Sequence, residues 1–321
     1  MIPVIETENL VKQFKVGHGF LGGYSRQLTA VDRVSISVNS GETLGLVGES
    51  GSGKSTVGNC ILRLLTATDG RVLYRGKDIL SMKEAEFQSI RGKLQVVFQD
   101  PQSSLDPRMT VQKIVGYPLK IQKGIKGKEL TDRVLAALKD VGLGSEHLDR
   151  YPHEFSGGQR QRIGIARALI TGPEFVVFDE PTSALDVSVQ AQILNLVTGL
   201  QKKYNYAYLF ISHDLAVVRH ISNRIAVMYL GAIVETAPKE RFFAEPCHPY
   251  SKALIASVPR PDPFQRQTLS VLTGDVPSPL HLPKGCRFSP RCNKAMDICR
   301  KIPPPHIKVV TDHWLDCHLY G

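Results

Sequence analysis

The sequence has no long hydrophobic run. A helix that crosses a bilayer needs about 20 consecutive apolar residues, and the longest apolar runs, such as 175–178 and 207–211, are far shorter. The first residues contain neither a basic segment nor a long apolar one, so we expect no signal peptide. The chain is therefore expected in the reducing cytoplasm, where structural disulfides are rare.

Basic stretches interleaved with aromatic residues are also lacking. Lys and Arg number 40 against 30 Asp and Glu, which gives a formal net charge of +10. We interpret this excess as a solvated basic surface and expect no nucleic-acid partner. With 42% hydrophobic and 22% charged residues among 321, the composition is that of a folded globular protein and excludes a disordered or collagen-like chain.

Proline and cysteine are scarce before residue 240 and frequent after it. Residues 241–321 hold 12 of the 20 prolines and five of the six cysteines. This predicts a loop-rich extension with little regular structure, which needs a staple because it buries little apolar surface. We therefore predict two domains, 1–240 and 241–321.

Short β-rich runs alternate with helical patterns in the first domain. Strands are expected at 43–47, 94–98, 175–178, 207–211 and 225–228. Helices are expected at 54–65, 130–141, 158–170, 187–203 and 215–221. This alternation predicts an α/β core with a largely parallel sheet, and the segment from about 100 to 170 reads as an inserted helical subdomain.

Residues 48–56 read Gly-Glu-Ser-Gly-Ser-Gly-Lys-Ser-Thr and fit G-x-x-x-x-G-K-[ST] between a predicted strand and a predicted helix. Glycines let the backbone approach an anion, and the N–H groups at the helix start attract phosphate. Lys54 would add a full charge at the β- and γ-phosphates, and Ser55 a hydroxyl for Mg²⁺. The predicted nucleotide-binding residues of this loop are Gly48, Ser50, Gly51, Ser52, Gly53, Lys54, Ser55 and Thr56.

The apolar run 175–178 leads into two acids, Asp179 and Glu180. Ligand sites lie at the carboxyl ends of strands in open α/β sheets. Asp179 would hold Mg²⁺, and Glu180 would orient and polarise the attacking water. An acidic strand–loop junction is the alternative, but the position 125 residues after Lys54 favours a catalytic site.

Residues 155–162, Phe-Ser-Gly-Gly-Gln-Arg-Gln-Arg, resemble the signature motif of ABC-type ATPases, which usually has Leu where Phe155 stands. Ser156 is suited to cap the following helix, and the glycines expose N–H groups to an anion. The chain has one phosphate loop and one signature. The resemblance therefore implies a P-loop ABC nucleotide-binding domain that works as a head-to-tail dimer. In that dimer the partner's ATP would meet Ser156, Gly157, Gly158 and Gln159.

The remaining ABC motifs occur in the family's order over about 240 residues. By resemblance, Gln99 is the Q-loop glutamine and His213 the switch histidine, which would make Glu180, His213, Gln99 and Lys54 the catalytic set. The D-loop would be Ser183, Ala184, Leu185 and Asp186, and Mg²⁺ would be held through Ser55, Gln99 and Asp179. Phe14 is the best match to the aromatic residue that stacks on adenine, and Tyr24 is a weaker rival. Taken singly, Gln99, His213 and Phe14 could be a strand end, a loop histidine and a core aromatic.

Segments outside these motifs resemble the ATP-binding subunits of oligopeptide and dipeptide importers. They are 99–108, 248–254 and 285–292, while 30–35 and 41–47 resemble the second of the two ATPases that such importers usually carry. The resemblance implies ATP hydrolysis that drives di- or oligopeptide uptake from the cytoplasmic face of the membrane. It also implies two transmembrane permease subunits, a sister ATPase and an extracytoplasmic substrate-binding protein.

Several alternatives to peptide import stay open. The same family includes importers of nickel and of oligosaccharides. A non-transport ABC ATPase acting on nucleic acid or ribosomes has the net charge as its support. A catalytically dead cassette and an exporter motor are disfavoured, because Glu180 and His213 are both present and no membrane-spanning run is found.

Cys286, Cys292, Cys299 and Cys317 are separated by 5, 6 and 17 residues, unlike the C-x2-C pairs of common zinc ribbons. Four thiolates could hold zinc or a [4Fe–4S] cluster, and resemblance favours the cluster, because some peptide-importer ATPases bind one there. Four free cysteines are the remaining alternative. The neighbouring basic residues would offset thiolate charge; they are Arg287, Arg291, Lys294, Arg300 and Lys301. Cys60 is expected in the core, and Cys247 has no assigned role.

Overall fold

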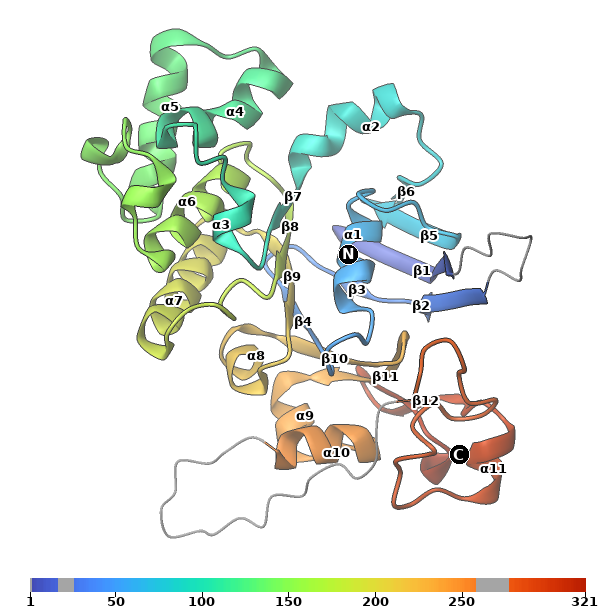
Figure 1. Cartoon of the computed structure of the whole chain (residues 1–321). Helices are drawn as coiled ribbons and strands as arrows, with labels where there is room; N and C mark the ends of the chain where they lie inside the picture. The colour runs from blue at the N-terminus through green and yellow to red at the C-terminus, as the bar shows by residue number, and fades with distance from the viewer. Residues whose placement is uncertain (1, 17–25, 258–276) are drawn as a thin grey trace, which may run out of the picture. The chain divides into compact units, whose positions relative to one another are not determined.

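The computed structural model describes residues 2–16, 26–257 and 277–321 (Figure 1). Tyr24 lies outside these ranges. The chain forms two compact units, and each is assembled from separated stretches of sequence. One unit contains Ser37–Thr43 and Leu73–Ile211, and the other contains Glu6–Ile36, Leu44–Val72 and Ser212–Gly321. Among the helices in the described ranges, none combines the length and the hydropathy that a bilayer crossing requires.

The first unit is built on three parallel strands. They pair in the order β7 (Leu94–Val97), β8 (Phe175–Asp179) and β9 (Ala207–Ser212). Residues 175–178 and the whole of β9 are buried, as expected for strands covered on both faces. The predicted strands at 94–98, 175–178 and 207–211 are therefore correct to within one residue at each end.

The described chain between β7 and β8 is helical (Figure 1). Its helices are α3 (Pro101–Ser104), α4 (Val111–Lys123), α5 (Gly127–Asp140) and α6 (Gly157–Leu169), with 3₁₀ turns at Ser145–His147 and Pro152–Glu154. α4, α5 and α6 pack on one another through apolar side chains spaced at helical intervals, such as Val111, Ile114 and Val115 on α4. The first unit also contains α2 (Glu84–Ile90), a 3₁₀ turn at Arg91–Lys93, and α7 (Val187–Tyr204).

The antiparallel strands near the N-terminus were not predicted. In the second unit β2 (Arg26–Val34) pairs antiparallel with β1 (Ile5–Val16). In the first unit the end of β5 (Asp69–Tyr74) pairs antiparallel with β6 (Lys77–Asp78), and β3 (Ser37–Val38) also belongs to that unit. Only three of the 12 residues of β1 are buried, and polar residues occupy much of its length. A strand of this kind lacks the apolar run or strict alternation by which a strand is predicted.

The second unit contains five further strands. β4 (Thr43–Val47) is parallel to β10 (Arg224–Tyr229), and antiparallel pairing continues through β11 (Ala232–Pro238), β13 (His313–Asp316) and β12 (His306–Val310). Its helices are α1 (Lys54–Ile61), α8 (Leu215–Ile221), α9 (Lys239–Ala244), α10 (Pro249–Ala256) and α11 (Asp297–Lys301), and a 3₁₀ turn lies at His318–Tyr320.

Two predictions for this unit are wrong. The helix predicted at 54–65 ends at Ile61, because Arg63 has a φ of 53°, which no right-handed helix can continue. Residues 241–321 contain more regular structure than their proline content predicts. β13 pairs with β11, so these strands extend an existing sheet and need no core of their own.

A buried carboxylate connects β11 with α10 and β13. Oε1 of Glu235 accepts the N–H of Cys247 at 2.8 Å and lies 2.8 Å from Nε2 of His313, while Oε2 accepts the N–H of His248 at 2.9 Å. Burial alone would raise the pKa of Glu235, but its hydrogen bonds, led by the one with His313, outweigh it and hold the pKa below its ordinary value. The carboxylate therefore stays ionised and joins three elements that are distant in sequence.

His248 caps α10, because its Nδ1 accepts the N–H of Tyr250 at 3.0 Å. Burial lowers the pKa of His248 to about 4, with the Glu235 charge acting in the opposite direction. The unfolded value is about 6.5, so between pH 6.5 and pH 4 the unfolded chain binds more protons than the folded chain. The contribution of His248 to stability is therefore lost as the pH falls through this window.

As the pH is lowered from 7 to 5, we expect His248 to decrease the free energy of unfolding by roughly 2 kcal/mol. His248→Asn keeps an acceptor for the cap and cannot be protonated, so its stability should depend less on pH. Urea denaturation followed by the fluorescence of Trp314, the single tryptophan of the sequence, reports on this unit directly. The same pH dependence in the variant and the wild type would contradict the assignment.

Candidate functional site

The predicted phosphate loop joins β4 to α1 in the second unit. Gly53 precedes the helix with a φ of 103°, and a Cβ atom there would lie 2.1 Å from the carbonyl oxygen of Ala30. Only glycine fits this position. No side chain caps α1, and the start of a helix is a favourable place for a phosphate.

Lys54 is the first residue of α1, and it is buried. Its Nζ donates to the carbonyl oxygens of Gly48 at 2.8 Å and Glu49 at 2.9 Å, and it lies 3.4 Å from Oγ of Ser52. The loop backbone thus places a positive charge inside the predicted phosphate cradle. Ser55, the next residue, is exposed.

His213 belongs to the same unit and lies exposed between β9 and α8. The next residue, Asp214, caps α8 by accepting the N–H groups of Ala216 at 2.8 Å and Val217 at 3.4 Å. The helix start therefore fixes the backbone on one side of His213.

Glu180 and Gln99 lie together in the first unit. Nε2 of Gln99 donates to Oε2 of Glu180 at 3.3 Å, although the two residues are 81 positions apart. Glu180 follows Asp179, the last residue of β8, and has a φ of 47°, which is uncommon outside glycine. Strained backbone of this kind persists where the surroundings enforce it, often at functional sites.

The Glu180 backbone is held on both sides. Its N–H donates to the carbonyl oxygen of Ile211 at 3.0 Å, and its own carbonyl oxygen accepts from the N–H of Ser183 at 3.3 Å and from Oγ of Ser183 at 3.1 Å. These bonds fix the backbone conformation of Glu180 at the end of the strand.

The predicted signature residues begin α6. Ser156 is the N-cap, since its Oγ accepts the N–H of Gln159 at 3.4 Å, and Oε1 of Gln159 accepts the N–H of Ser156 at 3.1 Å. Gly157 is the first residue of the helix. A Cβ atom on Gly158 would lie 2.4 Å from Cγ1 of Val189, so glycine lets the start of α6 approach α7 closely.

The predicted D-loop residues, 183–186, connect β8 to α7. Asp186 caps α7, because its Oδ1 accepts the N–H of Val189 at 2.9 Å and Oγ of Ser188 at 2.7 Å. These bonds, led by the one from Val189, lower the pKa of Asp186. Ser183, Ala184 and Asp186 are exposed, as a contact surface requires.

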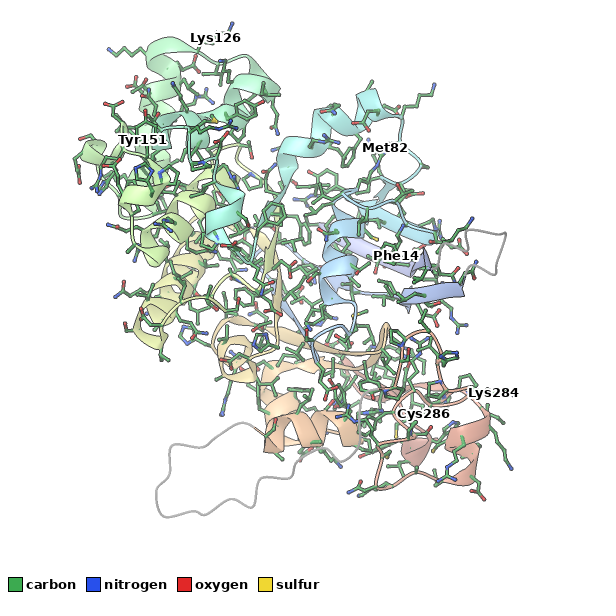
Figure 2. The ribbon with its side chains drawn as sticks, in the orientation of Figure 1. Phe14, Met82, Lys126, Tyr151, Lys284 and Cys286 are labelled. Atoms are coloured by element: carbon green, nitrogen blue, oxygen red, sulfur yellow. The ribbon has the colours of Figure 1, made fainter. Side chains whose placement is uncertain are left out.

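Phe14 lies on β1 opposite Leu28 of β2 (Figure 2). Its ring is half-buried, and Nζ of Lys12 lies 4.9 Å from the ring centre. One ring face is thus already in contact with a cation. The role of Phe14 in adenine stacking stays a prediction.

The four cysteines singled out in the sequence line one small cavity of about 10 Å³, which Phe288, Lys294 and His318 also line. Sγ of Cys299 accepts the N–H of Met296 at 3.4 Å. Burial raises the pKa of Cys286 to about 11 and also raises those of Cys292 and Cys317. Cys286 is labelled in Figure 2.

The positions of Arg287 and Arg291 beside these cysteines predict that they offset thiolate charge, and the structure corrects this. The guanidinium of Arg287 pairs with Asp32, and that of Arg291 pairs with Glu49. Their charges are therefore already balanced by carboxylates. Of the basic neighbours, Lys294 does line the cavity. Cys60 is buried in the core, as predicted, and burial raises its pKa to about 11.

Sequence reasoning missed a second constellation. Potential ligand atoms of Glu235, Cys247 and His313 lie within 4.8 Å of one another, and all three residues are buried. No sequence signal could have revealed this group, because Glu235 is 12 residues from Cys247 and 78 from His313 and belongs to no motif. Both carboxylate oxygens already accept bonds from within the chain, so the arrangement acts as a structural tie.

Two family comparisons match different parts of the chain. Residues 31–183 match the ABC transporter family. Residues 234–299 match the family described as the oligopeptide/dipeptide transporter C-terminal region. The first match includes the phosphate loop and Glu180, and the second includes Glu235 and three of the four clustered cysteines.

Curated relatives align with nearly the whole chain. A putative peptide import ATP-binding protein of Brucella abortus is 50% identical over 318 residues, covering 99% of this chain and 94% of the relative. The oligopeptide transport ATP-binding protein AppF of Bacillus subtilis is 46% identical over 321 residues, covering 99% and 98%.

A solved structure shares the fold of the cassette. It is the dimeric post-hydrolysis state of the ATP-binding cassette MJ0796 bound to ADP and Pi, with a TM-score of 0.64 and 30% identity over 73% of this chain and 98% of that one. Together with the sequence motifs, these similarities show that the chain belongs to the ATP-binding subunits of ABC transporters and carries the C-terminal region of the oligopeptide/dipeptide group.

Proposed function

We propose that this ABC ATPase drives the import of di- or oligopeptides. The observation that carries the proposal is the presence, in one chain, of an ABC phosphate loop and the oligopeptide/dipeptide transporter C-terminal region. The peptide-import names of relatives that align end to end support the same cargo. Loss of labelled peptide uptake on deletion of the gene, with uptake restored by the wild-type chain, would test it. A loss of nickel or oligosaccharide uptake instead would reassign the cargo.

Each predicted site residue has a chemical role in this proposal. Lys54 would neutralise charge on the β- and γ-phosphates, and Ser55, Gln99 and Asp179 are the residues that would hold the Mg²⁺ that accompanies ATP. Glu180 orients the attacking water, with His213 at the γ-phosphate. The buried ammonium of Lys54 and the strained, Gln99-bonded Glu180 support these roles, because phosphoryl transfer depends chiefly on positioned charge.

The signature residues imply that the ATPase works with a second ATPase subunit. Ser156, Gly157, Gly158 and Gln159 form an N-terminal helix cap whose N–H groups suit the phosphate of a partner's ATP, and a dimer is the form in which the related cassette was solved. We propose a sister ATPase as that partner. Two transmembrane permease subunits and an extracytoplasmic binding protein would complete the importer, with this chain peripheral on the cytoplasmic face.

The two predicted domains would have different roles in the transporter. Residues 1–240 would form the catalytic cassette, in which the helical segment at about 100–170 couples ATP hydrolysis to the permeases. Residues 241–321 would form the extension that holds the cysteines. The continuous helical stretch between β7 and β8 supports the first assignment.

We further propose that Cys286, Cys292, Cys299 and Cys317 bind a [4Fe–4S] cluster. The donor set fits, because the four thiols line one cavity and that of Cys299 accepts a backbone N–H, a contact that stabilises a bound thiolate. A bound cluster would staple the extension.

The cluster proposal predicts about four iron and four sulfide per chain in protein purified without oxygen. Cys292→Ser removes one ligand and should abolish both, together with the visible absorption. Cys247→Ser is the matched control, since Cys247 does not line the cavity, and it should retain the iron. One zinc per chain would exclude the iron–sulfur cluster, although a metal would still crosslink the extension. The absence of any metal would show that the four thiols serve only in packing.

Glu180→Gln should leave ATP binding intact and slow hydrolysis by a factor of about 10² or more, because the amide cannot polarise the water. Nucleotide binding and phosphate release by the purified protein or assembled transporter measure the two effects separately. Glu146→Gln is the control, because Glu146 is an exposed carboxylate on a 3₁₀ turn. Normal turnover in Glu180→Gln would show that another residue orients the water.

A further inference from the structure

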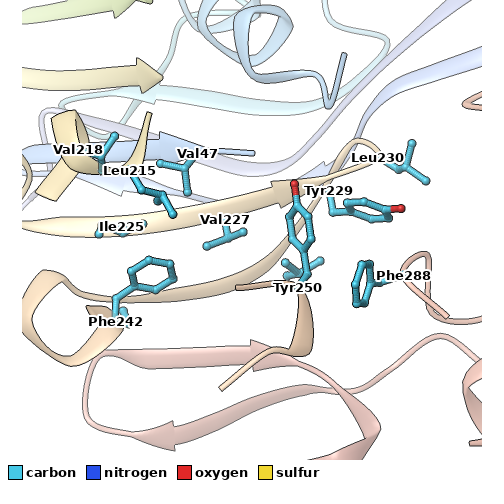
Figure 3. Packing of buried hydrophobic residues seen from close by; sticks show 12 residues of the cluster. Val47, Leu215, Val218, Ile225, Val227, Tyr229, Leu230, Phe242, Tyr250 and Phe288 are labelled. Carbon is cyan, nitrogen blue, oxygen red and sulfur yellow. The ribbon is translucent and has the colours of Figure 1, made fainter. Parts of the chain in front are cut away.

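The C-terminal extension contacts the phosphate loop through a turn that also bears two of the clustered cysteines. This turn, residues 286–292, is closed by the N–H of Ser289 on the carbonyl oxygen of Cys286 at 3.0 Å and by the N–H of Arg291 on that of Phe288 at 3.0 Å. Phe288 is buried, and its ring packs on those of Tyr229 and Tyr250, as Figure 3 shows at the end of β10. The turn is therefore anchored in the core of the second unit.

Arg291 forms a bidentate salt bridge with Glu49, the second residue of the phosphate loop. Its Nη1 lies 2.8 Å from Oε2 of Glu49 and its Nη2 lies 3.1 Å from Oε1, while the Arg291 side chain is only 6% exposed. Two parallel bonds of this kind fix geometry as well as charge, and a lysine cannot reproduce them. Oη of Tyr250 accepts the N–H of Glu49 at 2.9 Å. Both the side chain and the backbone of Glu49 are thus held by residues of the extension.

Glu49 also supplies, through the peptide group that follows it, one of the oxygens that position the catalytic lysine. Its carbonyl accepts from Nζ of Lys54 at 2.9 Å. A shift of the Glu49 peptide would therefore move an acceptor of the charge that is to meet the ATP phosphates. Arg291 and Tyr250 therefore influence the position of the Lys54 ammonium through Glu49, without contacting the ammonium themselves.

A second connection runs from Arg287. Its guanidinium bonds to the carboxylate of Asp32 and to the carbonyl oxygen of Leu230. The next residue, Gly231, donates its N–H to the carbonyl oxygen of Ser52 in the phosphate loop at 2.9 Å. The turn thus supports the loop at two points, Glu49 and Ser52.

We propose that Arg291 and Tyr250 are positioning residues for nucleotide binding, through which the 286–292 turn sets the affinity of the phosphate loop for Mg-ATP. The proposal rests on the proposed binding of ATP at residues 48–56. Arg291 directly precedes Cys292, so the residue that holds Glu49 is the sequence neighbour of one of the clustered cysteines.

The test measures the dissociation constant of Mg-ATP on the full chain by calorimetry. Arg291→Met should raise it about tenfold, which corresponds to ~1.4 kcal/mol. Arg291→Lys should restore part of the affinity, since it keeps the charge but not the paired bonds. Tyr250→Phe removes one hydroxyl from a buried ring and should raise the constant by a factor of about three, with little risk to folding.

Two comparisons separate positioning from general destabilisation. Glu49→Gln combined with Arg291→Met should bind no more weakly than Arg291→Met alone, because both changes break one pair. Arg241→Met is the matched control, since Arg241 pairs with Glu245 within α9, and it should bind Mg-ATP as the wild type does. In the assembled transporter Arg291→Met should raise the KM for ATP and leave kcat within about a factor of two.

The outcomes distinguish this inference from the proposed function. A wild-type chain that does not bind Mg-ATP would overturn both. A wild-type chain that binds, with unchanged affinity in folded Arg291→Met and Tyr250→Phe, would overturn the positioning role alone. The positioning role would also be overturned if Arg241→Met weakened Mg-ATP binding as much as Arg291→Met does. It would likewise be overturned if the effects of Glu49→Gln and Arg291→Met on the dissociation constant were fully additive. In either case the weaker binding would reflect a general loss of stability.

Discussion

The second unit depends on the ionised carboxylate of Glu235. A buried charge without partners is costly, and removing one partner of a buried pair typically costs about 3–5 kcal/mol. Here the charge is compensated by N–H groups from Cys247 and His248 and by the ring of His313. Satisfying this one group fixes the start of α10 and the position of β13 at the same time.

The constraint extends from Glu235 to the phosphate loop by a short series of contacts. Glu235 holds the backbone of His248, His248 caps α10, and α10 presents the hydroxyl of Tyr250 to the N–H of Glu49. Glu49 in turn holds Lys54 through its carbonyl oxygen. The extension lies outside the ABC motifs. Its residues nevertheless support the phosphate loop, which is one of those motifs.

The fold and the site could be predicted from sequence where the signal is local. α8 has the predicted bounds, and the phosphate loop lies between the strand and the helix expected for it. β1, β2 and β5 were missed, because their half-buried residues give no apolar run. The types of residue at the site were predicted, but the contact between Gln99 and Glu180 follows from strand order, which the sequence does not encode locally. Arg291 was read as a partner of thiolates because its neighbour is cysteine, whereas its carboxylate partner lies 242 positions away.

That separation has a consequence for how the protein is made. Chains fold largely as they leave the ribosome, from the N-terminus onward. The phosphate loop is synthesised within the first 60 residues, but Tyr250, Arg287 and Arg291, which support it, are among the last quarter. The loop therefore passes most of synthesis without its supports, and a ribosome-bound chain that stops before residue 250 has every residue of the phosphate-loop motif but not its final geometry. The contacts from Tyr250, Arg287 and Arg291 can therefore form only after the C-terminal turn has been synthesised.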